Sequence, residues 1–431
     1  MRANRHQSQA LLATAALALA LTLLAPTVAR AAGTQSMWRL YNPYTGEHLY
    51  TSSTSERNAL AEIGWQPEGV GWIAPTSSQT PVYRLFNPYV DDHHYTTSVD
   101  ECVALVDAGW RDEGICWYSD DAKTVEVKRQ FNPYEQRGTH NYTYSQDEAN
   151  ALVSRGWHDE GAAWYAVARG DVTVTTSSGI TVGGPEGFTG SAEFQRVEQA
   201  ISSVRAAGRD IGVVMYDLHS GRSLSYNANK SFYSASTAKA LYCAMILENY
   251  GSAGANTRLV EASLVDSDNA SYGRLVDIYG RPQFDRWLAA NGAPSAYHPS
   301  AALDYLYISA GETANAWEHI WNWWLSGDAG SSEFAGYMRR TRHSAMGGLF
   351  RKRYEAWCKP GWYPDSPVGI NATNDVGIVF SDCGPYVLVV MTNYGNNFRP
   401  LFSIIDALNA CHGALCGGST ESLLTGHETR S

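Results

Sequence analysis

Ser236-Thr237-Ala238-Lys239 decides how the C-terminal half of this chain is interpreted, because it places a hydroxyl and an amine one helical turn apart. Positions i and i+3 lie on one face of an α-helix. Lys239 is the only lysine in the sequence with a serine three residues before it. A serine hydroxyl is a weak nucleophile until a base removes its proton, and a desolvated lysine amine can be that base. Since serine and lysine also meet at this spacing by chance, the surrounding sequence decides how much weight the pattern carries.

Two further motifs follow Ser236 along the chain. Ser267-Asp268-Asn269 follows a helical apolar pattern, and Lys359-Pro360-Gly361 stands at the entry to a strand-rich segment. Taken singly, the first could be an ordinary helix cap and the second could carry a surface lysine. The order S-x-x-K, S-D-N and K-x-G resembles that of the serine β-lactamases and penicillin-binding proteins, especially class A. The resemblance covers about 194–412, and apolar segments that read as strands flank the motifs at 212–217, 223–226, 374–380 and 386–391.

The resemblance implies an α+β domain at 193–413, with helices flanking an antiparallel sheet, and a serine acyl-enzyme mechanism. Ser236 would be the acylated nucleophile and Lys239 its base, kept neutral by burial and by the nearby charge of Lys359. Ser267 would pass the proton to the leaving nitrogen, and Asn269 would hold Lys239 and the substrate amide. Lys359 would face the substrate carboxylate.

Substrate contacts are expected from the strand that carries Gly361 and Trp362. The resemblance implies an oxyanion hole formed by the backbone N–H groups of Ser236 and Trp362. Pro360 departs from the usual threonine or serine, so it removes a hydroxyl that binds the substrate carboxylate and a backbone donor of the strand. Thr373 is expected to supply that hydroxyl instead.

A second departure concerns the water that deacylates the enzyme. The family activates this water with an E-x-x-x-N loop, and 318–322 fits the spacing but lies in a tryptophan-rich helical run, where such pairs usually form a solvated face. The stretch between Lys239 and Ser267 is also shorter than is typical of class A, which predicts a trimmed helical domain and a more open cleft. Without a positioned carboxylate, we expect a penicilloyl-enzyme to be hydrolysed slowly.

Residues 37–168 contain three copies of one sequence unit, whose turns begin at Tyr41, Phe86 and Phe131. Each copy has an aromatic-Asn-Pro-Tyr turn, a His-x-Tyr-Thr strand, a Ser-x-x-Glu capping box, Gly-Trp, and Glu-Gly before another tryptophan. One unit cannot bury its own apolar face, so we expect the three to pack together as a β-rich domain. A closed ring with pseudo-threefold symmetry, similar to a β-trefoil, is one such arrangement.

These units resemble a repeat of uncharacterised function found in secreted bacterial proteins beside cell-wall hydrolases. Binding of a glycan or wall polymer is a more plausible role for this domain than metal binding. His48, His93 and His140 recur in the units, but no acidic or cysteine partner recurs at ligand spacing, so no metal or other cofactor is expected. Rings packed in an aromatic core explain these histidines.

The start of the chain predicts export. Arg2 and Arg5 precede an apolar run at 11–25, and Ala29-Arg30-Ala31 is a cleavage site, so 1–31 is interpreted as a signal peptide. We expect a secreted or wall-associated bacterial protein with no membrane contact after cleavage. A linker is expected at 169–192 and a disordered tail at 414–431. The net charge of −11 argues against nucleic acid and anionic lipid as partners.

Seven cysteines in an exported chain predict disulfides, with one cysteine left over. Cys102 and Cys116 lie in one unit and are expected to pair. Cys243 lies on the apolar helix after Ser236 and is interpreted as a small buried hydrophobe. The pairing stays open among the remaining cysteines, which are Cys358, Cys383, Cys411 and Cys416.

The sequence therefore favours a secreted serine hydrolase, D-Ala-D-Ala carboxypeptidase-like or β-lactamase-like, that acts on peptidoglycan stem peptides or β-lactams. The repeats would hold it at the cell wall. One alternative is a wall-binding or adhesion protein with a degenerate hydrolase module, which Pro360 favours. Another is a true class A β-lactamase, which requires a carboxylate near the acyl carbon.

Overall fold

The computed structural model describes residues 33–299, 305–366 and 370–417. The predicted signal peptide at 1–31 lies outside these residues. Most of the predicted tail also lies outside them, and its first residues belong to helix α12 (Arg399–Cys416) instead. In the described ranges, no helix combines the length and the apolar character that crossing a bilayer requires.

The N-terminal part of the described chain, called the β-domain here (34–166), contains three units with the same order of elements: two strands, a helix and a third strand. The first strand of each unit lies between the other two and pairs antiparallel with both. The units comprise β1 (Thr34–Tyr41), β2 (His48–Thr51), α1 (Thr54–Glu62) and β3 (Gln66–Pro75); β4 (Pro81–Asn87), β5 (Asp92–Thr96), α2 (Val99–Asp107) and β6 (Arg111–Tyr118); β7 (Val125–Phe131), β8 (His140–Thr143), α3 (Gln146–Ser154) and β9 (His158–Ala166).

Each helix of the β-domain begins after a serine, as the sequence predicted. Ser53, Ser98 and Ser145 are the N-caps, and each hydroxyl accepts a 3.2 Å hydrogen bond from the backbone N–H three residues later. The reciprocal half of the expected capping box is not formed in these three described helices. The glutamates that would form it pair with arginines of neighbouring units instead.

Three buried tyrosines connect the units through a closed cycle of hydrogen bonds. The Tyr50 hydroxyl donates to the Tyr142 carbonyl and accepts from the Tyr142 N–H, both at 3.0 Å. The Tyr95 hydroxyl makes the same pair of bonds to Tyr50, at 3.3 and 3.1 Å. The Tyr142 hydroxyl makes them to Tyr95, at 3.0 and 3.2 Å. Three buried tryptophans pack against this cycle, namely Trp72, Trp117 and Trp164.

A second cycle of contacts surrounds the tyrosines and is made of ion pairs. An arginine in the first strand of each unit lies within 3.2 Å of the helix glutamate of another unit, and within 2.8 Å of the Glu-Gly glutamate of its own unit. The pairs between units are Arg39–Glu148, Arg84–Glu56 and Arg129–Glu101. Because every unit contributes one arginine and one helix glutamate, the units hold one another in a closed order.

The recurring histidines pack on aromatic rings, as the sequence predicted. The rings of His48, His93 and His140 lie 5.0 to 5.2 Å from the aromatic residue that opens each Asn-Pro turn. An acidic partner does recur in space, contrary to the prediction, because the Glu-Gly glutamate of each unit lies 3.3 to 3.7 Å from the histidine Nε2. The arginine that binds the same glutamate brings a positive charge into each cluster, so the ion pair in each cluster is the one between arginine and glutamate.

The C-terminal part contains a seven-stranded sheet in which all neighbours are antiparallel, in the order β11-β12-β14-β13-β19-β18-β17. The predicted strands at 212–217, 223–226, 374–380 and 386–391 all lie in this sheet. Its strands are β11 (Asp171–Thr175), β12 (Ile180–Pro185), β13 (Ile211–Asp217), β14 (Ser223–Tyr226), β17 (Glu355–Tyr363), β18 (Ala372–Ser381) and β19 (Gly384–Thr392).

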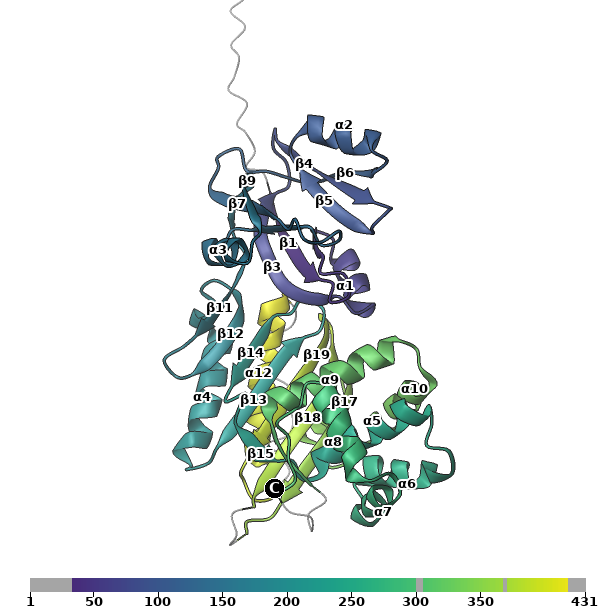
Figure 1. The fold of residues 1–431 in the computed structure, drawn as a ribbon. Helices are drawn as coiled ribbons and strands as arrows, with labels where there is room; N and C mark the ends of the chain where they lie inside the picture. The colour runs from purple at the N-terminus through teal and green to yellow at the C-terminus, as the bar shows by residue number, and fades with distance from the viewer. Residues whose placement is uncertain (1–32, 300–304, 367–369, 418–431) are drawn as a thin grey trace, which may run out of the picture. The chain divides into compact units, whose positions relative to one another are not determined.

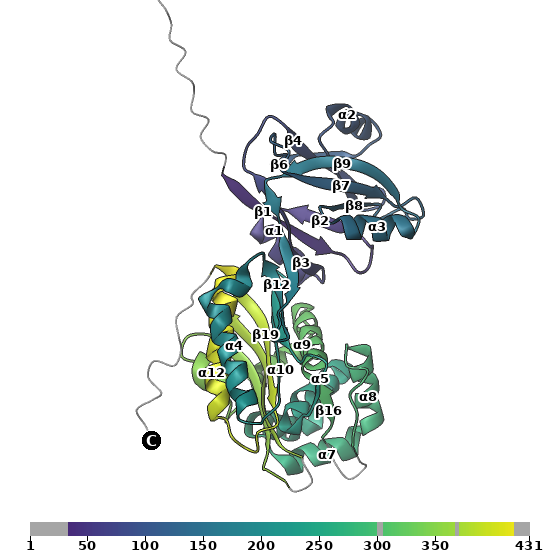
Figure 2. The same cartoon turned by 90° about the vertical axis from the view of Figure 1, so that its left-hand side faces the viewer.

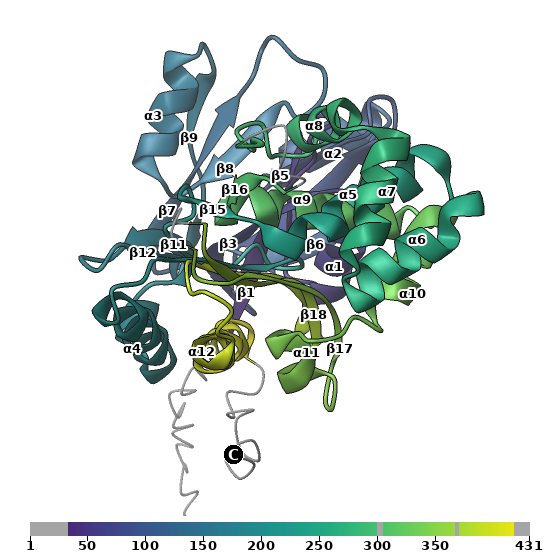
Figure 3. The ribbon, with the colours of Figure 1, turned by 90° about the horizontal axis from the view of Figure 1, so that it is seen from below.

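Helices cover both faces of this sheet (Figures 1 and 3). Along β13, Val213 and Met215 face one apolar layer and Val214 the other, as the period of a strand requires. One layer holds α4 (Ala192–Ala206), α11 (Ala345–Phe350) and α12, of which α4 and α12 lie side by side in Figure 2. The other holds α5 (Ala238–Tyr250), α7 (Asn269–Tyr279), α8 (Arg281–Ala290), α9 (Ala310–Leu325) and α10 (Ala329–Met338).

Residues 169–192, expected to be a linker, are largely strand. Arg169 belongs to β10 (Ala168–Arg169), which pairs with β3, and the following hairpin supplies β11 and β12 of the seven-stranded sheet. The Thr-Thr-Ser-Ser-Gly stretch that suggested a linker lies at the turn of this hairpin. Serine and glycine favour turns whether or not the flanking residues form strands, so they predicted the turn and not its context.

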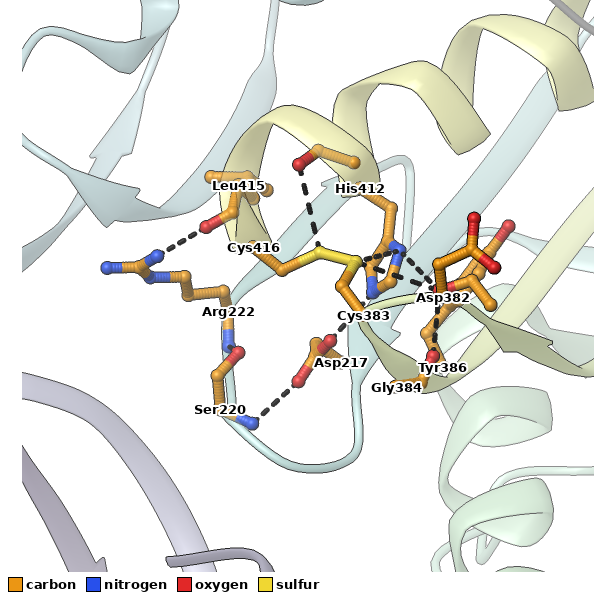
Figure 4. Close-up of a disulfide and its surroundings, with 12 residues drawn as sticks. Asp217, Ser220, Arg222, Asp382, Cys383, Gly384, Tyr386, His412, Leu415 and Cys416 are labelled. Carbon is orange, nitrogen blue, oxygen red and sulfur yellow. Dashed lines mark hydrogen bonds and ion pairs between the residues drawn. A yellow bond between two sulfur atoms is a disulfide. The ribbon is translucent and has the colours of Figure 1, made fainter. Parts of the chain in front are cut away.

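One disulfide joins Cys383, between β18 and β19, to Cys416 at the end of α12 (Figure 4). It ties the C-terminal helix to the sheet above a buried pair in which His412 Nε2 lies 2.7 Å from Asp217 Oδ2. The expected pairing of Cys102 with Cys116 is wrong, since both are free. They lie on different elements, α2 and β6, and the Cys116 thiol donates to a backbone carbonyl of β4. Cys243 is free and buried, as expected.

Replacing Tyr95 by phenylalanine should destabilise the β-domain. Tyr95→Phe keeps the ring but leaves the buried N–H and carbonyl of Tyr50 without the partners described above. A buried polar group without a partner costs about 1–3 kcal/mol. Chemical denaturation of the full chain, followed by tryptophan fluorescence, measures this loss. Tyr134→Phe is the matched control, because Tyr134 is 75% exposed, and equal stability of the two variants would contradict the role of the cycle.

Candidate active site

Ser236 lies at the start of the central helix of its layer. It follows β15 (Ser231–Tyr233) in a short 3₁₀ turn, 235–237, that leads into α5. The preceding residue, Ala235, has φ +44°, a left-handed conformation that costs energy for any residue except glycine. Ser236 is half-buried, whereas 238–247 are all buried. Helix α5 is therefore fixed on all sides and holds the serine at its exposed end.

Lys239 is fully buried on α5, and its amine contacts the second motif. Nζ donates to the Ser267 carbonyl at 2.5 Å and to Asn269 Oδ1 at 2.7 Å, and it lies 3.5 Å from Ser267 Oγ. No hydrogen bond joins Lys239 to the Ser236 hydroxyl among the described residues. The structure thus brings Lys239, Ser267 and Asn269 together as predicted, without the direct contact between serine and lysine that the sequence led us to expect.

Lys359 reaches the same serine hydroxyl from the opposite side of the site. It is fully buried on β17, and its Nζ donates to Ser267 Oγ at 2.8 Å. Ser267 follows a π-helical turn at 262–266 and has φ +60°, so a strained backbone holds its hydroxyl between the two amines. Residues from three separate elements therefore converge on one oxygen atom.

Burial changes the protonation of both amines. Desolvation lowers the pKa of Lys239 to about 8, partly opposed by the charge of Asp268. Desolvation and then the charge of Lys239 lower the pKa of Lys359 to about 7, and the buried carboxyl of Asp375 opposes this shift. Near neutral pH the pair can hold one proton fewer than two ordinary lysines, and Lys359, which has the lower pKa, loses its proton first. The form in which Lys239 is the uncharged base and Lys359 keeps its charge is therefore the less populated one.

Strand β17 lies directly against the turn that carries Ser236. A Cβ atom built on Gly361 would lie 2.7 Å from the Ser234 carbonyl oxygen and the Thr237 nitrogen, and 2.9 Å from the Ser236 nitrogen. Only glycine fits at this position. The close approach of the two segments places the backbone of Gly361, which precedes Trp362, beside the Ser236 N–H. The Trp362 side chain packs elsewhere, with ring centroids 6.1 and 5.7 Å from those of His343 and Phe398.

Thr373 does not offer a hydroxyl to a substrate, which corrects the role predicted for it. Thr373 is fully buried, and its Oγ1 donates to the Tyr394 carbonyl at 3.0 Å and accepts from the Asn397 N–H at 2.9 Å. The neighbouring strand β17 is an edge strand, which explains why it tolerates Pro360. The hydroxyl that Pro360 removes is therefore not replaced by Thr373.

The E-x-x-x-N candidate lies away from these residues. Glu318 lies on α9 and lines a cavity over the sheet with Val214, Tyr216 and Asn315, and burial raises the pKa of its carboxyl. Asn322 is exposed. The lining of that cavity includes none of the residues that meet at Ser267, so Glu318 does not act as the water-activating carboxylate in this arrangement.

Tyr305 is part of the site, and the sequence did not point to it. Its hydroxyl donates to Asn269 Oδ1 at 2.8 Å, the same atom that accepts from Lys239. The Lys239 amine lies 5.7 Å from the ring centroid of Tyr305 and 5.8 Å from that of Tyr272, distances at which aromatic faces stabilise a cation. No short motif marks such a tyrosine, because its partners come from distant segments of the chain.

The pH dependence of acylation should report the two amines. The Lys239 amine can accept a proton only above its pKa of about 8, and Lys359 keeps its charge only below its pKa of about 7. The second-order rate of acylation by penicillin should therefore be bell-shaped, with a maximum between about pH 7 and 8. Lys359→Ala should abolish the falling limb. A rate of the unmodified protein that still rises at pH 9 would contradict this assignment.

Gly361→Ala should block acylation. The added methyl group would displace β17 from the Ser236 N–H, and the loss of one oxyanion-hole donor costs about 100- to 1,000-fold in rate. The measurement is the rate of penicillin adduct formation. Gly336→Ala is the control, because a Cβ atom there meets no other atom within 4 Å. Equal rates for the two variants would count against the placement of the hole.

Comparison with solved structures found β-lactamases and a penicillin-binding protein. A β-lactamase from Sphaerobacter thermophilus is 16% identical, covers 52% of this chain and 97% of its own, and has a TM-score of 0.43. A class A β-lactamase from Bacteroides cellulosilyticus is 16% identical, covers 52% and 99%, and has a TM-score of 0.45. The structure described as PBP-A is 17% identical, covers 51% and 95%, and has a TM-score of 0.44. A search of curated proteins found no match to this chain.

Two family models match the chain. The model of a domain of unknown function, DUF5648, matches residues 36–167, which include all but the first two residues of the β-domain. The model of the beta-lactamase enzyme family matches residues 194–258 and 250–408. The two ranges of this model together contain all the residues that meet at Ser267, as well as Ser236 and Gly361. Residues 194–408 therefore match the beta-lactamase enzyme family over just under half of the chain, and this part has a mixed helix and sheet fold.

Proposed function

We propose that this protein is an exported serine acyl-enzyme hydrolase that acts on D-Ala-D-Ala stem peptides of peptidoglycan or on β-lactams. The observation that carries the proposal is the position of Ser267 Oγ between two buried amines of lowered pKa, beside the strained turn that holds Ser236. A hydroxyl with a base on one side and a charged donor on the other can relay a proton.

The proposed reaction begins when Ser236 Oγ attacks the carbonyl carbon of the scissile amide. Its proton passes to uncharged Lys239, and the oxyanion is held by the backbone N–H groups of Ser236 and Trp362. As the C–N bond breaks, Ser267 donates its proton to the leaving nitrogen and is reprotonated by the Lys239 ammonium. Lys359 binds the substrate carboxylate, and the product of this step is an ester on Ser236.

Hydrolysis of that ester is proposed to be slow for a β-lactam. Among the described residues, no carboxylate makes a hydrogen bond to Lys239 or to Asn269. The side chain that shares Asn269 with Lys239 is the phenol of Tyr305, not a carboxylate. This supports penicillin-binding behaviour, D-Ala-D-Ala carboxypeptidase-like, over efficient destruction of the antibiotic.

The β-domain is proposed to be a three-repeat ring that holds the enzyme at the cell wall by binding glycan. The closed cycle of tyrosine hydrogen bonds and the cycle of ion pairs support the ring. Export is proposed from the sequence of 1–31. A chain that is secreted and bound to the wall would meet its substrate at high local concentration.

The second candidate is a wall-binding or adhesion protein whose hydrolase module is inactive. The observation that favours it is the engagement of Lys239 with Ser267 and Asn269, without a hydrogen bond to Ser236 within the described structure. Rotation of the Ser236 hydroxyl and of the lysine side chain on substrate binding would be needed for catalysis. Adduct formation separates the two candidates.

A labelled penicillin should form a lasting adduct on Ser236. We expect one penicilloyl group per chain, located by mass spectrometry of peptides, to persist for many minutes after excess penicillin is removed. Ser236→Ala should form none. An adduct that never forms favours the inactive module, whereas rapid repeated turnover without a lasting adduct favours a true β-lactamase.

A further inference from the structure

Three tyrosines at equivalent positions of the β-domain are the most exposed large apolar side chains of the described chain. Tyr44 is 86% exposed, and Tyr89 and Tyr134 are each 75% exposed. Each is the tyrosine of an Asn-Pro-Tyr turn. A single exposed aromatic ring needs no explanation, but the same ring exposed at the same place in all three units points to a shared use.

The backbone under each tyrosine is fixed in the same way. The Asn two residues earlier accepts a hydrogen bond from the tyrosine N–H, at 3.0 Å in the first unit and 3.1 Å in the other two. Each ring lies over a glycine with φ of 95° or 96°, at which a Cβ atom would come within 3.7, 2.6 and 3.0 Å of the ring or its hydroxyl. These glycines are Gly64, Gly109 and Gly156. The backbone of each tyrosine and the glycine beside its ring are therefore arranged alike in all three units.

The three loops that carry these tyrosines meet one another. Glu47, at the end of the first loop, accepts a hydrogen bond from the His93 N–H at 3.1 Å. Asp92, at the end of the second loop, accepts one from the Thr139 hydroxyl at 3.1 Å. In the third loop, a Cβ atom on Gly138 would lie 2.4 Å from the backbone of the first loop, so these two loops are in direct contact. The three tyrosines therefore belong to one end of the β-domain.

We propose that these loops form a three-point binding surface for a glycan strand, with the faces of Tyr44, Tyr89 and Tyr134 stacked on sugar rings. A tyrosine offers a flat apolar face and a polar hydroxyl at its edge, and a pyranose ring has the same combination of C–H faces and polar edges. The tyrosines are flanked in the loops mostly by polar residues, unlike the contiguous apolar centre of a protein interface. The inference rests on the wall-binding role proposed above and assigns that role to particular side chains.

Binding through three linked weak contacts predicts a graded loss. Each of Tyr44→Ala, Tyr89→Ala and Tyr134→Ala should weaken binding of the full chain to insoluble peptidoglycan by about 3- to 10-fold. The triple variant should lose at least about 100-fold. Sedimentation with purified peptidoglycan measures this binding, and Tyr250→Ala is the matched control, because Tyr250 is 54% exposed on α5 and lies outside the β-domain.

Unchanged thermal unfolding and unchanged penicillin labelling of Ser236 would show that the triple variant remains folded. A soluble β-1,4-linked N-acetylglucosamine oligomer should compete with peptidoglycan for the unmodified chain. Competition by a stem peptide alone, or equal binding of the triple variant and the unmodified chain, would overturn the assignment to the tyrosines and leave the wall-binding role intact. Failure of the unmodified chain to bind peptidoglycan would overturn both, without bearing on the acyl-enzyme chemistry.

Discussion

Burial of two lysine amines around one serine hydroxyl is the constraint on which the C-terminal domain depends. Removing an ammonium group from water costs several kcal/mol unless the protein supplies partners. Here a carbonyl, an amide oxygen and a hydroxyl supply them to Lys239, and the same hydroxyl serves Lys359. The amines come from α5 and β17, and their partners come from the segment around the start of α7. The helical layer and the edge of the sheet must therefore keep their relative positions for the amines to keep these hydrogen bonds.

The backbone is strained at two residues of this site. Ala235 and Ser267 both have positive φ values, and both stand next to the groups that are expected to react. Strain of this kind persists only where the surrounding structure fixes it. The buried length of α5 fixes the first residue, and the π-helical turn before Ser267 fixes the second. The apolar core therefore does more than stabilise the fold, because it maintains two backbone conformations that a short loop would relax.

The sequence predicted the sheet well and the polar contacts less well. Strands such as β13 and β19 are apolar on both sides and are bounded by clear turns, so local pattern was enough to place them. Thr373 and the capping glutamates were misassigned, because a hydroxyl or a carboxylate can satisfy several partners and only the fold decides which one is near. Tyr305 was missed for the same reason. The motifs located Lys239, Ser267, Asn269 and Lys359 because their order along the chain carries information that a lone tyrosine does not.

The closed cycle of tyrosines fixes the copy number of the β-domain. In an open array, a unit can be gained or lost at an end, since each unit touches only its neighbours. Here the tyrosine hydroxyl of every unit donates to the unit before it in the closed order, and every unit accepts such a bond from the unit after it. A two-unit version therefore leaves buried groups unmatched, and a fourth unit finds no place in the cycle. Recombination between these similar segments should therefore be selected against, and the three segments should diverge in surface residues while their number stays constant.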